Sequence, residues 1–184
     1  MTDSATAAHQ ATGTSSLRLL RSFADTAGAD TDGAGTDGAG TAGDLLGTRE
    51  EAAGWLHAAG LLAAGERLTG SEHNALLRLR ASLRDVLAAH AEGREDPEAA
   101  ARLTRGLADG RLVVVAESAT TVELATAARA SYPAIVASIA VAVARAAASG
   151  TWSRLKLCSD RGCGQSFIDE SPTGVISQCA ASSG

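Results

Sequence analysis

The stretch from Pro133 to Ser149 is apolar on almost every side, and it constrains the fold more than any other part of the chain. A helix without a polar face has to be surrounded by other elements, so this stretch predicts a helix at the centre of the core. Gly150 follows it and is a typical helix terminator. The most apolar part, 133–144, is too short to cross a bilayer, because a spanning helix needs about 20 apolar residues.

Three further helices are marked by the residues that begin them. The segments 48–51 (TREE) and 69–72 (TGSE) are capping boxes, in which a threonine and a glutamate three residues later satisfy free backbone N–H groups. The first helix is expected to end at Ala59, before a glycine. The dipeptide at 96–97 (DP) places a capping residue before a proline and predicts a helix that ends near Ala108.

The second of these helices combines an apolar stripe with a row of arginines. Apolar residues recur at spacings of three and four, as one buried helix face requires. They are Leu76, Leu79, Leu83, Val86 and Leu87. Arg78, Arg80 and Arg84 fall largely off this stripe. They could line a pocket for an acidic ligand, and the competing interpretation is a solvated face with partners one helical turn away.

A single small β-hairpin is expected before the central helix. The segment 111–115 (RLVVV) is short and β-branched, which is typical of a strand, and 122–124 (VEL) can pair with it. Hydrophobic residues make up 45% of the chain and aromatic residues only 3%, so the core has to be built mostly from Ala, Leu and Val. The predicted fold is therefore mainly α, an α+β helical domain with one hairpin.

Composition divides the chain into three parts. Residues 1–16 are rich in Thr, Ser and Ala and are expected to be a disordered tail. Residues 17–150 are expected to form the helical domain, beginning with one or two helical turns at 17–23. Within it, 25–44 is built from Gly, Ala, Thr and Asp, which bury little surface, so a flexible loop is predicted. Residues 151–184 form a separate C-terminal segment.

All three cysteines of the chain, Cys158, Cys163 and Cys179, lie in the C-terminal segment. A structural zinc site takes four soft ligands, usually as two close pairs. Repeating the first spacing from Cys179 leads to Gly184, so we expect a zinc site cut at its fourth ligand. Water, Asp169 or a partner chain would have to complete it. The competing interpretation is three ordinary thiols, with a Cys158–Cys163 disulfide on oxidation.

Four motifs of the C-terminal segment carry a family resemblance: 154–158 (RLKLC), 162–164 (GCG), 167–171 (FIDES) and 178–179 (QC). Together they resemble the CGNR zinc finger. In that family a fourth cysteine follows, with Gly-Asn-Arg and a basic tail, and this sequence lacks them. The resemblance therefore indicates a truncated, frameshifted or decayed finger.

The segments 20–26 (LRSFADT), 55–56 (WL), 60–62 (GLL) and 77–80 (LRLR) resemble the ABATE domain, to which such a finger is usually attached. The resemblance implies a bacterial transcriptional regulator of stress responses. Its helical domain would sense a signal, and its finger would bind zinc and contact DNA. The partners implied are duplex DNA, an unidentified small-molecule signal and a second copy of the chain, with no membrane.

Arg154, Lys156 and Arg161 are the cations expected to meet DNA phosphates. Three acidic residues of the same segment balance them, and the formal net charge of the chain is −5, which argues against broad affinity for nucleic acid. The alternative function is therefore a ligand- or protein-interaction module that does not bind DNA and whose finger has decayed.

An enzyme is not expected. The sequence shows no Gly-rich phosphate loop, no nucleophile elbow and no paired catalytic carboxylates. Of the zinc deaminase pattern it has only His-x-Glu, at 90–92, without the Pro-Cys-x-x-Cys element. Residues 1–16 lack the basic and apolar regions of a secretory signal, so a cytoplasmic location is expected. In that reducing setting clustered cysteines bind metal more often than they form disulfides.

Overall fold

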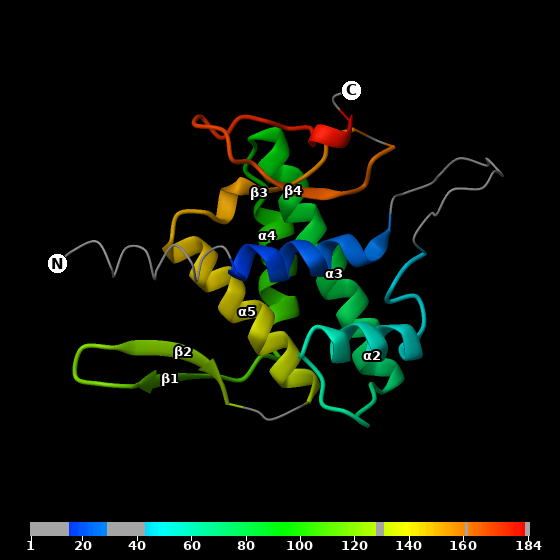
Figure 1. The fold of residues 1–184 in the computed structure, drawn as a ribbon, viewed down its shortest axis with the longest axis vertical. Helices are drawn as coiled ribbons and strands as arrows, with labels where there is room; N and C mark the ends of the chain where they lie inside the picture. The colour runs from blue at the N-terminus through cyan, green and yellow to red at the C-terminus, as the bar shows by residue number, and fades with distance from the viewer. Residues whose placement is uncertain (1–14, 29–42, 128–130, 161, 183–184) are drawn as a thin grey trace.

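The computed structural model of the 184-residue chain describes residues 15–28, 43–127, 131–160 and 162–182. Residues 15–24 are helical, and the further helices are η1 (Asp25–Ala27), α2 (Arg49–Ala58), α3 (Gly70–Glu92), α4 (Pro97–Leu107), α5 (Tyr132–Ala148), η2 (Trp152–Arg154) and η3 (Ala180–Ser182). The strands are β1 (Leu112–Ala116), β2 (Val122–Thr126), β3 (Leu155–Leu157) and β4 (Ser166–Ile168). The mainly helical α+β fold predicted from the sequence is confirmed (Figure 1).

The starts of three helices follow from their capping residues. At α2, the Thr48 hydroxyl accepts a hydrogen bond from the Glu51 N–H at 3.2 Å, and the Glu51 carboxylate accepts one from the Thr48 N–H at 2.9 Å. Thr69 and Glu72 repeat this arrangement at α3. Asp96 caps α4, with Pro97 in its first turn. Both capping boxes and the Asp-Pro start are therefore confirmed.

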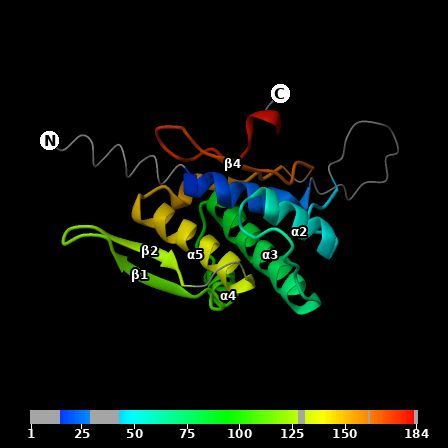
Figure 2. The same ribbon diagram turned by 60° about the horizontal axis from the view of Figure 1, so that its bottom comes forward.

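Helix α5 lies in the core, as predicted, beside α3 and under the helix of residues 15–24 (Figures 1 and 2). Fully buried side chains from all three helices meet there, among them Leu20, Phe23, Leu79, Ile135 and Ile139. The first helix is longer than the one or two turns expected. No helix among the described residues is long and apolar enough to cross a membrane.

The two described ends of the 25–44 loop are held together beside α3. The N–H of Leu45 donates to the Thr26 carbonyl at 2.9 Å. Arg80 forms a bidentate ion pair with Asp44, at 2.5 and 2.7 Å, and also donates to the Thr26 hydroxyl at 3.2 Å. Arg80 is only 8% exposed, so its expected place off the buried stripe is wrong. Residues 29–42 of the loop lie outside the described residues, as do 1–14 of the expected N-terminal tail.

The predicted hairpin is present as β1 paired with β2, in antiparallel register with Val114 opposite Leu124. A second two-stranded sheet, which the sequence did not predict, forms from β3 and β4 with Lys156 opposite Phe167. It packs against the C-terminal end of α3, where the ring of His90 meets the Leu155 carbonyl at 2.9 Å. The C-terminal segment is thus docked on the helical domain (Figure 1).

Candidate functional site

The C-terminal segment brings its cysteines together from three different places in the chain. Cys158 directly follows β3, Cys163 lies between β3 and β4, and Cys179 follows the long 170–178 loop. That loop returns to the sheet because the Ser159 N–H donates to the Ser177 carbonyl at 2.9 Å. The three residues predicted from the sequence as metal ligands therefore meet in space.

The cluster has the dimensions of a metal site. The three Sγ atoms lie within 4.8 Å of one another, and those of Cys163 and Cys179 are 3.4 Å apart. A tetrahedral ion held by sulfur at about 2.3 Å separates its sulfurs by about 3.8 Å, so the thiols need only small shifts to bind one. The backbone N–H of Cys179 also donates to Cys158 Sγ at 3.4 Å, a contact that ties these two cysteines together.

Ser182 is a neighbour of the cluster that the sequence did not reveal. Its Oγ lies 3.6 Å from the Sγ atoms of both Cys158 and Cys179. In a tetrahedral site with one oxygen ligand at about 2.0 Å, sulfur and oxygen are about 3.5 Å apart. Ser182 therefore lies where a fourth ligand would be expected relative to two of the three sulfurs. Serine is not a habitual metal ligand, so no motif marked it.

The three thiols are not equivalent. The hydrogen bond with Ser182, together with those to the other cysteines, lowers the pKa of Cys179 to about 7. Burial raises the pKa of Cys163. Cys179 therefore loses its proton more readily than Cys163, and the thiolate is the form that binds a metal ion.

Lys156 is fully buried beneath the 170–178 loop, with its side chain 3% exposed. Its Nζ donates to Asp169 Oδ2 at 2.8 Å and to the carbonyl oxygens of Gly174 and Ile176 at 2.7 and 2.8 Å. An ammonium group has three protons, so all of them are in use within the segment. Lys156 shapes the loop from the inside and does not face solvent.

Asp169, expected as a possible fourth metal ligand, is instead the centre of this loop. Its Oδ1 accepts from the N–H and hydroxyl of Ser171 at 3.0 and 2.6 Å, and its Oδ2 also accepts from the Ile176 N–H at 3.0 Å. Burial alone would raise the pKa of Asp169. The hydrogen bonds from Lys156, Ser171 and Ile176 outweigh burial and hold that pKa well below its usual range.

Arg154 and Arg161 are the other two cations predicted to contact DNA, and the structure describes only Arg154. Arg154 donates to the carbonyl oxygens of Asp169, Ser171 and Pro172, so it too supports the loop. Arg161 lies outside the described residues. Contact of these cations with DNA remains a prediction.

The three arginines of α3 point to different neighbours. Arg80 is committed to Asp44. Arg84 donates to the Ala24 carbonyl at 3.0 Å and to the Gly164 carbonyl at 2.9 Å, and so joins the first helix to the cysteine segment. Arg78 lines a cavity of about 450 Å³ between α3 and α4. The structure therefore does not gather the three side chains into one pocket.

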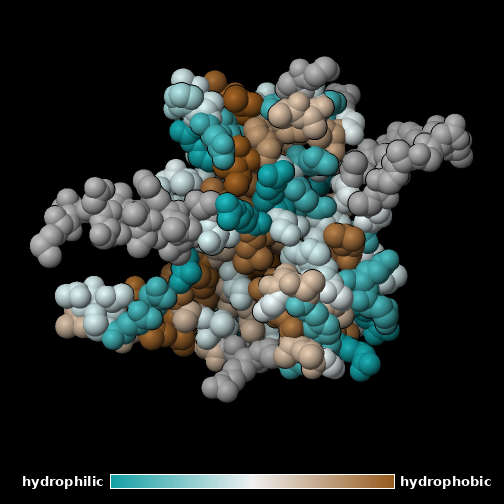
Figure 3. Space-filling view, in the orientation of Figure 1, coloured by the Kyte–Doolittle hydropathy of each residue, from teal (hydrophilic) through white to brown (hydrophobic). Residues whose placement is uncertain are grey.

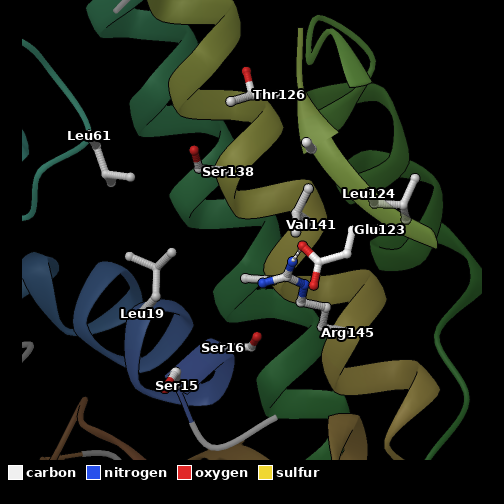
Figure 4. Close-up of a pocket in the computed structure, with 12 residues that line it drawn as sticks. Ser15, Ser16, Leu19, Leu61, Glu123, Leu124, Thr126, Ser138, Val141 and Arg145 are labelled. Carbon is white, nitrogen blue, oxygen red and sulfur yellow. Dashed lines mark hydrogen bonds and ion pairs between the residues drawn. The ribbon is translucent and has the colours of Figure 1, made fainter. Parts of the chain in front are cut away.

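A different cavity, of about 710 Å³, lies between the first helix, β2 and α5 (Figure 4). Helix α5 contributes Ser138, Val141, Ala142 and Arg145, whose spacing puts them on one helix face. The sequence predicted that α5 would be surrounded on all sides, so this opening was missed. Its volume lies within the range of about 300–1,000 Å³ that is typical of small-molecule sites.

The walls of this cavity are half apolar, and the polar half consists of four hydroxyl-bearing residues and one charged pair. Leu19 of the first helix and Leu61 face it across from α5 (Figure 4). Arg145 and Glu123 of β2 form an ion pair at 3.3 Å on its rim. An open cavity with both apolar and polar walls is suited to a small molecule that has an apolar part and polar groups.

Comparison with known protein families identifies the helical domain. The sequence model of the ABATE family, described as "Putative stress-induced transcription regulator", matches residues 7–150. Comparison with curated proteins finds no matching relative. The matched range covers the helical domain with its 710 Å³ cavity and ends before the first cysteine.

Proposed function

Because the chain belongs to the ABATE family, we propose that it is a transcription regulator that binds a small-molecule signal in its helical domain and zinc and DNA through its cysteine segment. The observation that carries the proposal is the cluster of three thiols docked at one end of a domain of that family. The role is one of binding and not of catalysis. The setting is the reducing cytoplasm, where the thiols stay free.

Zinc is the metal that three thiolates in this arrangement favour, since it takes tetrahedral sulfur ligands. Bound there, it would neutralise thiolate charge and cross-link the segment. Of the three cysteines, Cys179 alone follows the 170–178 loop, so the residues that shape this loop, Lys156 and Asp169, also position the third thiol. Among the described residues, the Ser182 hydroxyl is placed to approach the remaining position.

The helix of residues 15–24 links the proposed signal site to the cysteine segment. Its start lines the 710 Å³ cavity through Ser15, Ser16 and Leu19. Just past its end, Asp25 Oδ1 accepts hydrogen bonds from the N–H and hydroxyl of Ser166 in β4, both at 2.7 Å. A ligand that shifts this helix would therefore shift the sheet next to the cysteines.

The second candidate is the module that binds a ligand or protein but not DNA. The inward orientation of Lys156 and Arg154 favours it, because these cations are engaged with the loop. The formal net charge of −5 favours it as well, since each phosphate contact needs a cation.

Freshly purified, reduced protein should be assayed for zinc content and for binding to a mixed-sequence duplex DNA by fluorescence anisotropy at low and moderate salt. About one zinc per chain and DNA binding that a chelator abolishes are expected. Cys163→Ser should lose both, and Ser159→Ala, an exposed change next to Cys158, should lose neither. Zinc binding without DNA binding at any salt concentration would select the second candidate. Absence of zinc would refute the metal site.

A further inference from the structure

The β1–β2 hairpin exposes an unusual amount of apolar surface. Its exposed large side chains are Leu112, Val113, Val114, Val115, Val122 and Leu124. Val114 is 70% exposed and Val122 63%. Figure 3 shows hydrophobic residues gathered on the hairpin where it leaves the helical body. A two-stranded hairpin is only marginally stable in water, and a contiguous exposed apolar patch marks an interaction surface.

The two edges of the hairpin differ. Strand β2 packs against α5, and its Glu123 pairs with Arg145. Strand β1 lies on the outer side of the hairpin, away from α5, in both ribbon views (Figures 1 and 2). Among the described residues no strand other than β2 pairs with β1, so the outer edge of β1 can accept another strand, and such an edge is a template for pairing.

The hydrogen bonds of the hairpin show which groups this edge presents. The Arg111 carbonyl accepts from the Ala127 N–H at 2.7 Å, and the Glu117 N–H donates to the Thr121 carbonyl at 2.9 Å. Arg111 and Glu117 thus direct their backbone toward the β2 side. Because the direction alternates along a strand, Leu112, Val114 and Ala116 direct their N–H and C=O groups outward.

The outer edge is complementary to itself. Arg111 and Glu117 flank the apolar strand, and each stands three residues from Val114. Antiparallel pairing with a second copy, centred on Val114, puts Arg111 opposite Glu117 of the second copy at both ends. The same register puts Leu112 opposite Ala116 of the second copy, so all outward N–H and C=O groups face each other. Neither Arg111 nor Glu117 has an ion-pair partner within the described part of the chain.

We propose that β1 joins two copies of the chain across a two-fold axis at Val114, which creates a four-stranded antiparallel sheet with the order β2–β1–β1–β2. Backbone pairing supplies the contact, and the two Arg111–Glu117 pairs fix the register. A shift by two residues would keep the hydrogen-bond pattern but separate the charges. The β1 edge lies outside both the cysteine cluster and the lining of the 710 Å³ cavity, and the inference does not depend on the proposed function.

The test is a charge exchange, measured by analytical ultracentrifugation with reductant and a chelator present so that cysteines and metal cannot link the chains. In a dimer of the Arg111→Glu variant, two glutamates oppose each other at both ends of the paired strands. In a dimer of the Glu117→Arg variant, two arginines oppose each other there. Each should weaken self-association by about tenfold or more, because opposed pairs become repulsive. An equimolar mixture of the two variants should form a heterodimer, since every pair is then of opposite sign. Glu95→Arg, an exposed change of the same charge outside the hairpin, should have no effect.

A backbone variant tests the edge itself. Val114→Pro removes an outward N–H that the hairpin does not use, and proline is tolerated at such edge positions. It should abolish the dimer while the circular dichroism and thermal transition persist. A wild-type chain that stays monomeric at all concentrations would overturn the proposal. So would a dimer that resists Val114→Pro, or single charge variants that fail to restore association when mixed.

Discussion

Replacing Asp169 by asparagine should release the 170–178 loop from the domain. The substitution keeps the shape of the side chain but removes the negative charge that pairs with the buried Lys156 ammonium. Its single amide oxygen can accept either from Lys156 and Ile176 or from Ser171, so one set of donors then faces an NH2 group. The carbonyls of Gly174 and Ile176 remain as partners of Lys156. Removing one member of a buried ion pair costs about 3–5 kcal/mol. Because the two carbonyls still accept hydrogen bonds from Lys156, the expected loss of loop stability is near the lower end of this range, about 3 kcal/mol. That corresponds to a roughly 150-fold increase in the population of the open loop.

Amide hydrogen exchange followed by mass spectrometry would measure this change. Loss of protection in peptides covering 155–179 is expected, with the amides of α3 and α5 less affected. Glu170→Gln is the matched control, because it removes the same charge from the next residue, which is exposed. If Asp169→Asn and Glu170→Gln give the same exchange pattern, the buried pair does not hold the loop and the reasoning fails.

Five further outcomes are expected. The pKa of Asp169 is lower in the folded chain than in the unfolded chain, where it is about 3.9. The ionised carboxylate should therefore stabilise the fold fully above about pH 3.9, and this stabilisation should be lost as the pH falls further. Asp169→Asn should remove this pH dependence from thermal unfolding midpoints recorded between pH 5 and pH 2. Ser182→Ala should raise the pKa of Cys179 above about 7 in a thiol titration, whereas Ser182→Cys should tighten zinc binding in a chelator competition. Thr69→Ala should lower the free energy of unfolding by about 1 kcal/mol in urea, and a chelator should leave most of the helical circular dichroism intact.

The helical part of the fold was predictable because its signals are local. Capping by Thr48 and Thr69 is decided within four residues, and it places the starts of α2 and α3 where the structure has them. The β-branched run at 111–115 likewise identified β1. The cysteine cluster was predictable for a related reason, since motif spacing encodes a ligand set even when its members are far apart in the chain.

The charged interior was not predictable, because its partners are distant. Arg80 pairs with Asp44 across 36 positions, and Lys156 pairs with Asp169 across 13. A pattern of charges on a helix or strand cannot show that a partner will arrive from another element and allow burial. The β3–β4 sheet was missed because strands of three residues carry too little periodicity to detect.

Two of the elements that line the 710 Å³ cavity also contact other proposed sites, one the dimer edge and the other the cysteine segment. One wall is β2, which pairs with β1, the proposed dimer edge. The other is the helix of residues 15–24, which Asp25 and Arg84 tie to the cysteine segment. A ligand moves such elements only if it binds one arrangement more tightly than another. The coupling must then be reciprocal, so a ligand that strengthens dimerisation should bind the dimer more tightly than the Val114→Pro monomer. With one cavity in each chain, a saturating ligand should strengthen dimerisation by the square of that affinity ratio. Equal affinity for the two would mean that the cavity and the β1 edge act independently.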